Sequence, residues 1–333
     1  MILVQAKKQQ IFKILRESFE IWGDGLSFKH YLRFNYQLFN LAWAKNHYKF
    51  YVLASQNGVL AGFKLYSLKL NIQGRIFRIA GLGAIYVKKG FRQKGLGHQI
   101  IDLAIKHLAS KKYDGIVLFS DIASQFYTRH GFKVINQDDY IIDLDKDKII
   151  DHLKNTSQTP QKAINISEIL LDRKWAKILC TIYHKNYKLG HNLIRRCRHY
   201  LSFKLFKEHY ALKHAKTKSP VINFLIDIQN SSYIIFSSQK HQKLRILEVC
   251  GYNLIGLMTS LYYYCFKKNI YTIELFKPSP KLEEILGQFS QNTYLKKRDW
   301  GKFMLLSLHE KLARLTLGKN TENQIYIHEF DYF

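Results

Sequence analysis

Cysteine and proline are both scarce in this chain, with 4 of each among 333 residues. The cysteines are Cys180, Cys197, Cys250 and Cys265. They all lie in the second half and no two form a C-x-x-C pair, so neither a disulfide framework nor a zinc site is indicated. The few prolines and the absence of a long Ser/Gly tract exclude extended disorder. We expect a globular protein that binds no metal.

Acidic residues are also few, with 25 Asp and Glu against 52 Lys and Arg, for a formal net charge of +27. Such a charge favours acidic partners, among them nucleic acid, an anionic membrane or a polyanionic cofactor. A composition rich in Lys, Ile and Asn, as an AT-rich genome encodes, explains the charge equally well, because the basic residues are spread through both halves. Nucleic acid therefore stays open as a partner.

No segment is a convincing membrane span. Residues 249–266 are uncharged over 18 positions, the minimum for a span. Gly251, Asn253 and the three tyrosines at 262–264 lower their hydropathy, so we expect a buried strand followed by a buried helix. Residues 1–8 have no positive region ahead of an apolar run, as a signal peptide would. A cytoplasmic location is the expectation.

The most informative segment is a basic loop between a predicted strand at 81–87 and a predicted helix at 100–110. A loop of this kind suits a phosphate, because the first amides of a helix have no partner within it and the helix dipole favours an anion. Gly95 and Gly97 let the backbone approach the phosphate, and Arg92 and Lys94 add positive charge.

A second strand and helix follow the loop. Gly115 to Ser120 is predicted to be a buried strand, and residues 121–132 a short helix closed by Gly131. Tyr127 lies four residues before the Gly131-Phe132 pair.

These two patterns resemble the GNAT acetyltransferase superfamily. Arg92-x-x-Gly95-x-Gly97 is similar to its acetyl-coenzyme A pyrophosphate loop, (Gln or Arg)-x-x-Gly-x-(Gly or Ala). Tyr127-x-x-x-Gly131-Phe132 is similar to the end of its next strand–helix unit. The resemblance covers about the first 145 residues. It implies a mixed α/β sheet and N-acetyltransfer from acetyl-coenzyme A to a primary amine by direct attack in a ternary complex.

The resemblance also implies which residues contact the cofactor. Ser120 stands where relatives often have Asn, and it is shorter. The implied cofactor-binding residues are Ile85, Val87, Arg92, Gln93, Lys94, Gly95, Leu96, Gly97, His98 and Ser120.

Tyr127 is the candidate general acid, since a phenol can hydrogen-bond to or protonate the departing sulfur. The alternative is that Tyr127 only packs beside Phe126 and Phe132. Relatives often carry a glutamate base on the strand before the loop, but residues 77–87 contain no carboxylate. The base stays open among Asp24, Asp121, His30, a water relay, an amine that is already deprotonated, and the terminal carboxylate of Phe333.

The length predicts two domains. Residues 1–145 form the expected catalytic domain, ending with strands at 133–136 and 140–144, and the polar residues 146–165 form a linker. Residues 166–333 repeat the order of helices and strands and include a strand at 303–308. They predict a degenerate GNAT-like domain, on the general plan of the enhanced-intracellular-survival acetyltransferases. The loop at 251–253 contains no cation, so this domain is not expected to bind coenzyme A. An unrelated α/β domain is the alternative.

The function that these patterns favour is an acetyl-coenzyme A-dependent N-acetyltransferase. One alternative is a basic RNA- or tRNA-binding protein that acts on an amine attached to the nucleic acid. Another is a sensor that binds acyl-coenzyme A without turnover. The sequence leaves the acceptor, a small-molecule or peptide amine, and the oligomeric state open.

Overall fold

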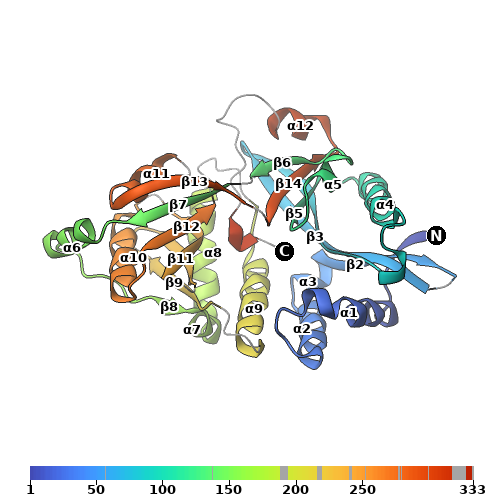
Figure 1. Cartoon of the computed structure of the whole chain (residues 1–333), viewed down its shortest axis with the longest axis horizontal. Coiled ribbons are helices and arrows are strands. Elements are labelled where there is room, and N and C mark those ends of the chain that lie inside the picture. The colour runs from blue at the N-terminus through green and yellow to red at the C-terminus, as the bar shows by residue number, and fades with distance from the viewer. Residues whose placement is uncertain are drawn as a thin grey trace.

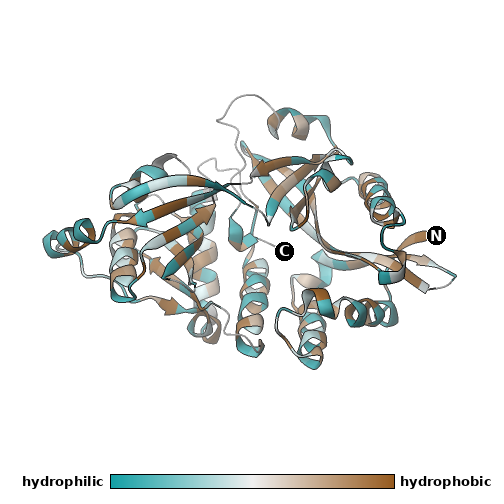
Figure 2. Ribbon diagram, in the orientation of Figure 1, coloured by the Kyte–Doolittle hydropathy of each residue, from teal (hydrophilic) through white to brown (hydrophobic). Residues whose placement is uncertain are grey.

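The computed structural model describes the chain except for residues 57, 137, 188–193, 216–219, 240–241, 252, 277, 279, 299, 317–327 and 332–333. In the described residues the strands form two seven-stranded mixed sheets that lie side by side (Figure 1). Each sheet has a hydrophobic core on both of its faces. Apolar residues are concentrated in the strands, and polar residues on the outer sides of helices (Figure 2).

The first sheet is built mainly from the N-terminal half. Helices α1, α2 and α3 pack on one face of this sheet and α4 and α5 on the other. The elements are β1 (Ile2–Gln5), α1 (Lys8–Trp22), α2 (Phe28–Asn40), α3 (Ala44–His47), β2 (Tyr48–Ser55), β3 (Gly58–Ile72), β4 (Arg75–Val87), the 3-10 helix η1 (Lys89–Phe91), α4 (Leu96–Ser110), β5 (Gly115–Ser120), α5 (Gln125–Thr128) and β6 (Lys133–Asn136).

The second sheet is built mainly from the C-terminal half. Helices α6, α10 and α11 pack on one face and α7, α8 and α9 on the other. The elements that follow β6 along the chain are β7 (Asp138–Leu144), α6 (Lys146–Asn155), β8 (Ile164–Asn165), α7 (Ile166–Leu171), α8 (Arg173–Tyr187), α9 (Arg198–His214), β9 (Ile222–Asp227), β10 (Ser232–Ser238), β11 (Lys243–Cys250), α10 (Ile255–Lys267), β12 (Thr272–Phe276), α11 (Pro280–Gly287), β13 (Ser290–Lys297), β14 (Lys302–Ser307), α12 (Glu310–Thr316) and the 3-10 helix η3 (Glu329–Asp331).

The two halves exchange one strand each. The first sheet has the order β1-β2-β3-β4-β5-β14-β6, so β14 from the C-terminal half lies between β5 and β6. The second has the order β8-β9-β10-β11-β12-β7-β13, so β7 from the N-terminal half lies between β12 and β13. The expectation that 140–144 completes the first sheet and 303–308 the second is therefore wrong. Each of these two strands pairs with a neighbouring strand on both sides. Only the complete set of strand pairings shows to which sheet each one belongs.

The strand orders correspond position by position, with β4·β5 and β11·β12 as the parallel pairs. A helix joins the members of each parallel pair, α4 in the first sheet and α10 in the second. The second half therefore repeats the fold of the first and is joined to it by the exchanged strands. If the chain is divided at residue 145 or 166, β14 is separated from the first sheet and β7 from the second.

The predicted linker, 146–165, is more regular than expected. It contains α6, whose N-cap is Asp145, and the Asp145 side chain accepts hydrogen bonds from the amides of Asp147 and Lys148. Near the C-terminus, η3 is buried: Asp331 forms ion-pair hydrogen bonds with Arg196 at 2.7 and 3.1 Å. Phe333, considered above as a base, lies outside the described residues.

Residues 249–250 end β11 and residues 255–266 form most of α10, as expected for a strand followed by a helix. Across the described ranges, the search for helices long and apolar enough to cross a membrane finds none.

Candidate active site

A cavity opens where two parallel strands part. The strands β4 and β5 pair from Ile79↔Gly115 to Leu82↔Leu118. Beyond Leu82, β4 stays paired with β3 up to Val87, while β5 stays paired with β14 up to Ser120. A cavity of about 730 Å³ lies at this divergence and is lined by residues of both strands.

A bulge in β4 faces this cavity. Gly62 of β3 pairs with Tyr86 and Lys64 pairs with Gly83, so Ala84 and Ile85 together lie opposite Phe63. Ala84 adopts a positive φ of 47°, which is unusual for a residue with a side chain and is frequent at functional sites. All four residues from Gly83 to Tyr86 line the cavity. The bulge interrupts the regular pairing and so makes backbone groups available for a ligand.

The basic loop that precedes α4 also lines the cavity. Gly95 is the N-cap of α4 and has a φ of 78°. The first bond of the helix runs from the amide of Gln99 to the carbonyl of Gly95, which leaves the amides of the preceding turn available. Arg92 curls back, and its Nε donates to the carbonyl of Val87 at 3.1 Å. The loop thus has the donors that an anion needs.

Most of the residues implied for the cofactor line this cavity. They are Ile85, Val87, Arg92, Gln93, Gly95, Gly97 and His98. Leu96 packs in the core beneath α4, and the Lys94 ammonium lies 5.9 Å from the ring centroid of Phe91. Ser120 is buried and donates to the carbonyl of Ile122 at 2.8 Å. Their contact with a cofactor stays a prediction.

Tyr127 packs against neighbouring aromatic side chains and also lines the cavity. It is 7% exposed, and its ring centroid lies 4.9 Å from that of Phe126 and 5.9 Å from that of Phe132. Burial, and secondarily the carboxylate of Asp121, raises the pKa of Tyr127 to about 12. The phenol is therefore protonated at neutral pH and can donate a hydrogen bond into the cavity.

Two consecutive hydrogen bonds connect His98 through His130 to Asp102. Nδ1 of His98 lies 2.8 Å from Nε2 of His130, and Nδ1 of His130 lies 2.7 Å from Oδ1 of Asp102. Because the carboxylate accepts from Nδ1 of His130, a neutral His130 presents Nε2 as an acceptor for the N–H at Nδ1 of His98. This chain of hydrogen bonds fixes the His98 ring, which lines the cavity beside Phe126.

Comparison with known proteins agrees with this geometry. Residues 8–132 match the model of the acetyltransferase (GNAT) family. The N-terminal unit is a GNAT domain. No curated protein matches the chain in sequence.

Solved structures share the fold of both units. A GCN5-related N-acetyltransferase from Anabaena variabilis is 13% identical, with a TM-score of 0.65 over 95% of this chain and 74% of its own. One from Kribbella flavida is 12% identical, with a TM-score of 0.62 over 95% and 74%. A conserved protein from Enterococcus faecalis is 13% identical, with a TM-score of 0.65 over 92% and 72%.

The far end of the cavity in the GNAT domain holds charges that the sequence analysis missed. Lys64 of β3 and Lys207 of α9 both line it, together with Asp24 and Tyr31. The even-numbered residues of β3 from Tyr66 to Ile72 are buried, so a lysine in the same register at 64 was a signal for a buried charge. No such signal existed for Lys207, because only the packing of α9 on α2 brings it here.

The candidate bases are only partly brought together. Asp24 and Asp121 line the cavity, and Oδ1 of Asp121 accepts from the amide of Gly301 at 3.0 Å. His30 does not line it; its ring stacks on that of His214 at 4.4 Å. A further carboxylate lies nearby, since the hydroxyl of Tyr86 donates to Glu17 at 2.7 Å. In the described part of the chain no three His, Cys, Asp or Glu side chains are grouped to hold a metal ion.

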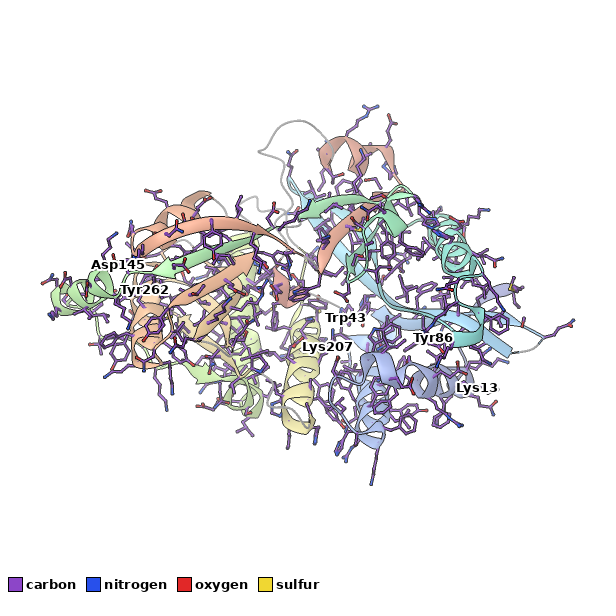
Figure 3. The ribbon with its side chains drawn as sticks, in the orientation of Figure 1. Lys13, Trp43, Tyr86, Asp145, Lys207 and Tyr262 are labelled. Atoms are coloured by element: carbon purple, nitrogen blue, oxygen red, sulfur yellow. The ribbon has the colours of Figure 1, made fainter. Side chains whose placement is uncertain are left out.

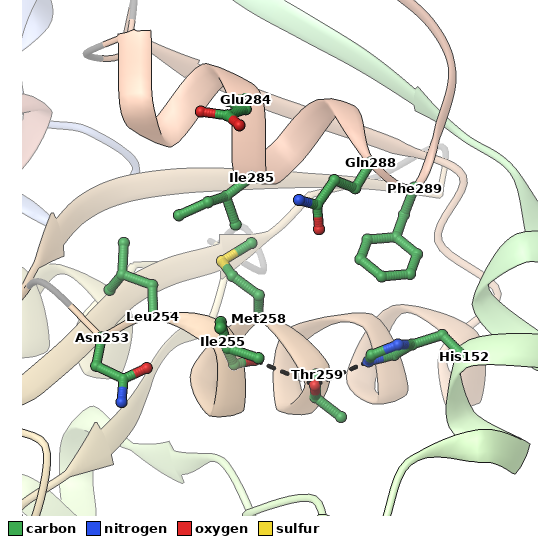
Figure 4. Close-up of a pocket in the computed structure, with 10 residues that line it drawn as sticks. All are labelled: His152, Asn253, Leu254, Ile255, Met258, Thr259, Glu284, Ile285, Gln288 and Phe289. Carbon is green, nitrogen blue, oxygen red and sulfur yellow. Dashed lines mark hydrogen bonds between the residues drawn. The ribbon is translucent and has the colours of Figure 1, made fainter.

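The second unit has a cavity of its own, about 470 Å³, between the start of α10, α11 and α6 (Figure 4). In it Nε2 of His152 lies 2.9 Å from Oγ1 of Thr259. Gly251 and Asn253, the described residues of the preceding loop, carry no charge. Tyr252 lies outside the described residues. That this unit binds no coenzyme A stays a prediction.

Proposed function

We propose that this protein transfers the acetyl group of acetyl-coenzyme A to a primary amine of an acceptor, by direct attack in a ternary complex. The observation that carries the proposal is the single cavity at the divergence of β4 and β5. It joins the loop at the start of α4 to the bulge at Ala84 and to Tyr127. A phosphate-binding loop, a backbone bulge and a protonated phenol in one cavity are what transfer from a nucleotide thioester requires.

The cofactor would be held along one line. Its diphosphate would accept hydrogen bonds from the first amides of α4, with Arg92 and His98 nearby. Its pantetheine arm would pair with the main chain of Ile85 and Val87, which line the cavity next to the bulge. The thioester would then lie near Gly83, Ala84 and Tyr127.

The reaction forms a C–N bond and breaks the C–S bond. The amine attacks the thioester carbonyl, whose oxygen becomes negative and is stabilised by backbone N–H groups near the bulge. The amine must lose a proton, which the carboxylate of Asp24 or of Asp121 can accept, and the departing thiolate must gain one. With a pKa of about 12, Tyr127 is a weaker acid than a thiol, at about 8.5. Its main contribution is a hydrogen bond to the sulfur as charge develops.

The test is release of coenzyme A thiol from acetyl-coenzyme A across a panel of amines, with the Tyr127→Phe variant beside the unchanged protein. We expect Tyr127→Phe to lower kcat about 10²-fold while KM for acetyl-coenzyme A changes little, because the phenol acts on the leaving group.

Tyr113→Phe is the matched control. It removes the hydroxyl of another buried tyrosine, which donates to Ser67 at 3.0 Å and does not line the cavity. We expect it to keep full activity. Absence of thiol release with every amine, together with no heat of acetyl-coenzyme A binding, would refute the proposed function.

A further inference from the structure

The acceptor end of the cavity is built from both units. Lys64 comes from β3, Asp24 from the turn between α1 and α2, and Lys207 from α9 of the second unit. Helix α9 packs against α2, and Lys207 lies between the two units (Figure 3). The second unit therefore contributes a charged side chain to the cavity of the GNAT domain.

Lys64 is held away from bulk water. Its ammonium donates to Oδ1 of Asn35 at 3.0 Å. Asn35 is fully buried, and its Nδ2 donates to the carbonyl of Tyr31 at 2.9 Å. A lysine on the surface of a protein normally extends its ammonium into solvent, whereas this one is fixed by a buried amide inside a cavity.

The charged form of Lys64 is disfavoured by its surroundings. Burial, and after it the charge of Lys207, lowers the pKa of Lys64 to about 7. Burial also lowers the pKa of Lys207, against the opposing effects of Glu208 and Asp24. Asp24 is the carboxylate that favours the charged form of Lys64, and it is exposed. A solvated carboxylate compensates poorly for an ammonium group that is held away from water.

Lys64 also stands next to the proposed reaction centre. It is the cross-strand partner of Gly83, the residue before Ala84 of the bulge. A group of the acceptor bound at Lys64 would therefore lie close to the amine that attacks the thioester.

We propose that the acceptor is an amine that also carries an anionic group, a carboxylate or a phosphate, which binds between Lys64 and Lys207. Such a group supplies the counter-charge for the Lys64 ammonium, whose hydrogen bond is to the neutral amide of Asn35, and Lys207 lines the same end of the cavity. Amines that carry several positive charges, such as polyamines, would be repelled from this end of the cavity. The inference rests on the proposed function and extends it to the class of acceptor.

Binding of an anion should take up a proton. Lys64 faces Lys207 from α9, Asp24 from the α1–α2 turn and Asn35 from α2. An anion favours the charged form of Lys64 and raises its pKa above the value of about 7 in the free protein. Affinity is then fully present below pH 7 and falls as the pH rises through 7 toward the higher pKa of the complex.

The first experiment is calorimetry of the full chain with inorganic phosphate and with acetate, using chloride at equal ionic strength as the reference. Each anion should bind, and repeating the titration in two buffers of different ionisation enthalpy should show proton uptake at pH 7.5. Lys64→Gln and Lys207→Gln should each weaken binding by about tenfold or more.

Lys69→Gln and Lys213→Gln are the matched controls, because they remove exposed charges from the same two elements, β3 and α9. Both should bind as the unchanged chain does. Binding of neither anion, or equal binding by the variants and the controls, would overturn the inference.

The second experiment compares turnover of paired amines, phosphoethanolamine with ethanolamine and β-alanine with its amide. The anionic member of at least one pair should show the higher kcat/KM, and the pair that responds distinguishes phosphate from carboxylate. If the neutral members have the higher kcat/KM, the proposed acetyltransferase activity is supported but the inference of an anionic acceptor is wrong. Lysine-dependent anion binding without turnover of any amine would support the anion site and count against the proposed function.

Discussion

Gly95 controls the shape of the loop that we propose to bind the diphosphate. Its φ of 78° lies in the left-handed region, and nothing lies within 4 Å of the position that a Cβ would take. The constraint at this residue is therefore one of backbone conformation and not of space. Gly74, in the turn between β3 and β4, is its counterpart away from the site, with a φ of 76° and equally open surroundings.

We expect Gly95→Ala and Gly74→Ala to destabilise the protein equally, by about 1 kcal/mol, because each forces a side chain into the left-handed region. Only Gly95→Ala should raise KM for acetyl-coenzyme A, since relaxation of the loop moves the amides at the start of α4. Urea unfolding and steady-state kinetics on both variants provide the measurement. An equal KM in the two variants would show that this loop does not hold the cofactor.

Asp102 acts on the cavity only through two histidines. Its side chain is 57% exposed, so Asp102→Asn should change the free energy of unfolding by no more than about 0.5 kcal/mol. The variant loses the charge that holds His130, and with it the orientation of His98. We expect KM for acetyl-coenzyme A to rise several-fold with kcat little changed.

Asp151→Asn is the control for this prediction, because it removes an exposed carboxylate from α6, far along the chain from the cavity. It should leave both kinetic constants as they are. If Asp102→Asn also leaves KM unchanged, the chain of hydrogen bonds has no part in cofactor binding.

The short helix η3 fastens the C-terminal end of the described chain to the second unit. Asp331 is buried and pairs with Arg196, which in turn donates to Glu248 at 2.7 Å. The hydroxyl of Tyr200, from α9, donates to Asp331 at 3.1 Å. This cluster fixes the start of α9, the helix that carries Lys207 into the cavity of the GNAT domain.

Asp331→Ala should lower the free energy of unfolding by about 3–5 kcal/mol, because it leaves the Arg196 guanidinium buried with one of its two acidic partners missing. Glu310→Ala breaks an ion pair with Arg314 in which both side chains are 75% exposed, and it should cost less than about 1 kcal/mol. Chemical denaturation of the two variants measures the difference. Similar losses in both would mean that the buried cluster does not stabilise this end of the chain.

The whole molecule is held together by its two exchanged strands. Without β14, the first sheet would expose the edges of β5 and β6, and without β7 the second would expose those of β12 and β13. Unpaired interior edges are unstable and prone to association. The two units are therefore expected to fold as one body, although each has its own hydrophobic cores.

Fragments 1–160 and 161–333 test this dependence. Expressed alone, each should be aggregated or loosely folded, because each lacks an interior strand. Expressed together, they should form a stable heterodimer with the circular dichroism spectrum and cooperative unfolding of the intact chain. A fragment 1–160 that is monomeric and unfolds cooperatively by itself would contradict the prediction.

Much of the candidate site could be predicted because it is local in sequence. Arg92 to His98 and Tyr127 to Phe132 lie on consecutive segments, and the spacing of their glycines expresses backbone requirements that short stretches satisfy. The bulge at Ala84 and the charge of Lys207 were not predictable in this way. The first depends on how β3 pairs with β4, and the second on the packing of α9 against α2.

The sequence by itself determined the elements, the loop before α4 and the family of the N-terminal unit, because helical periodicity and backbone geometry depend on neighbouring residues. Only the tertiary structure decided which sheet contains β7 and which contains β14, and which charged side chains meet at the far end of the cavity. Strand pairing and the contact between units join residues more than a hundred positions apart. The energy of such contacts depends on the whole fold and leaves little trace in any short segment.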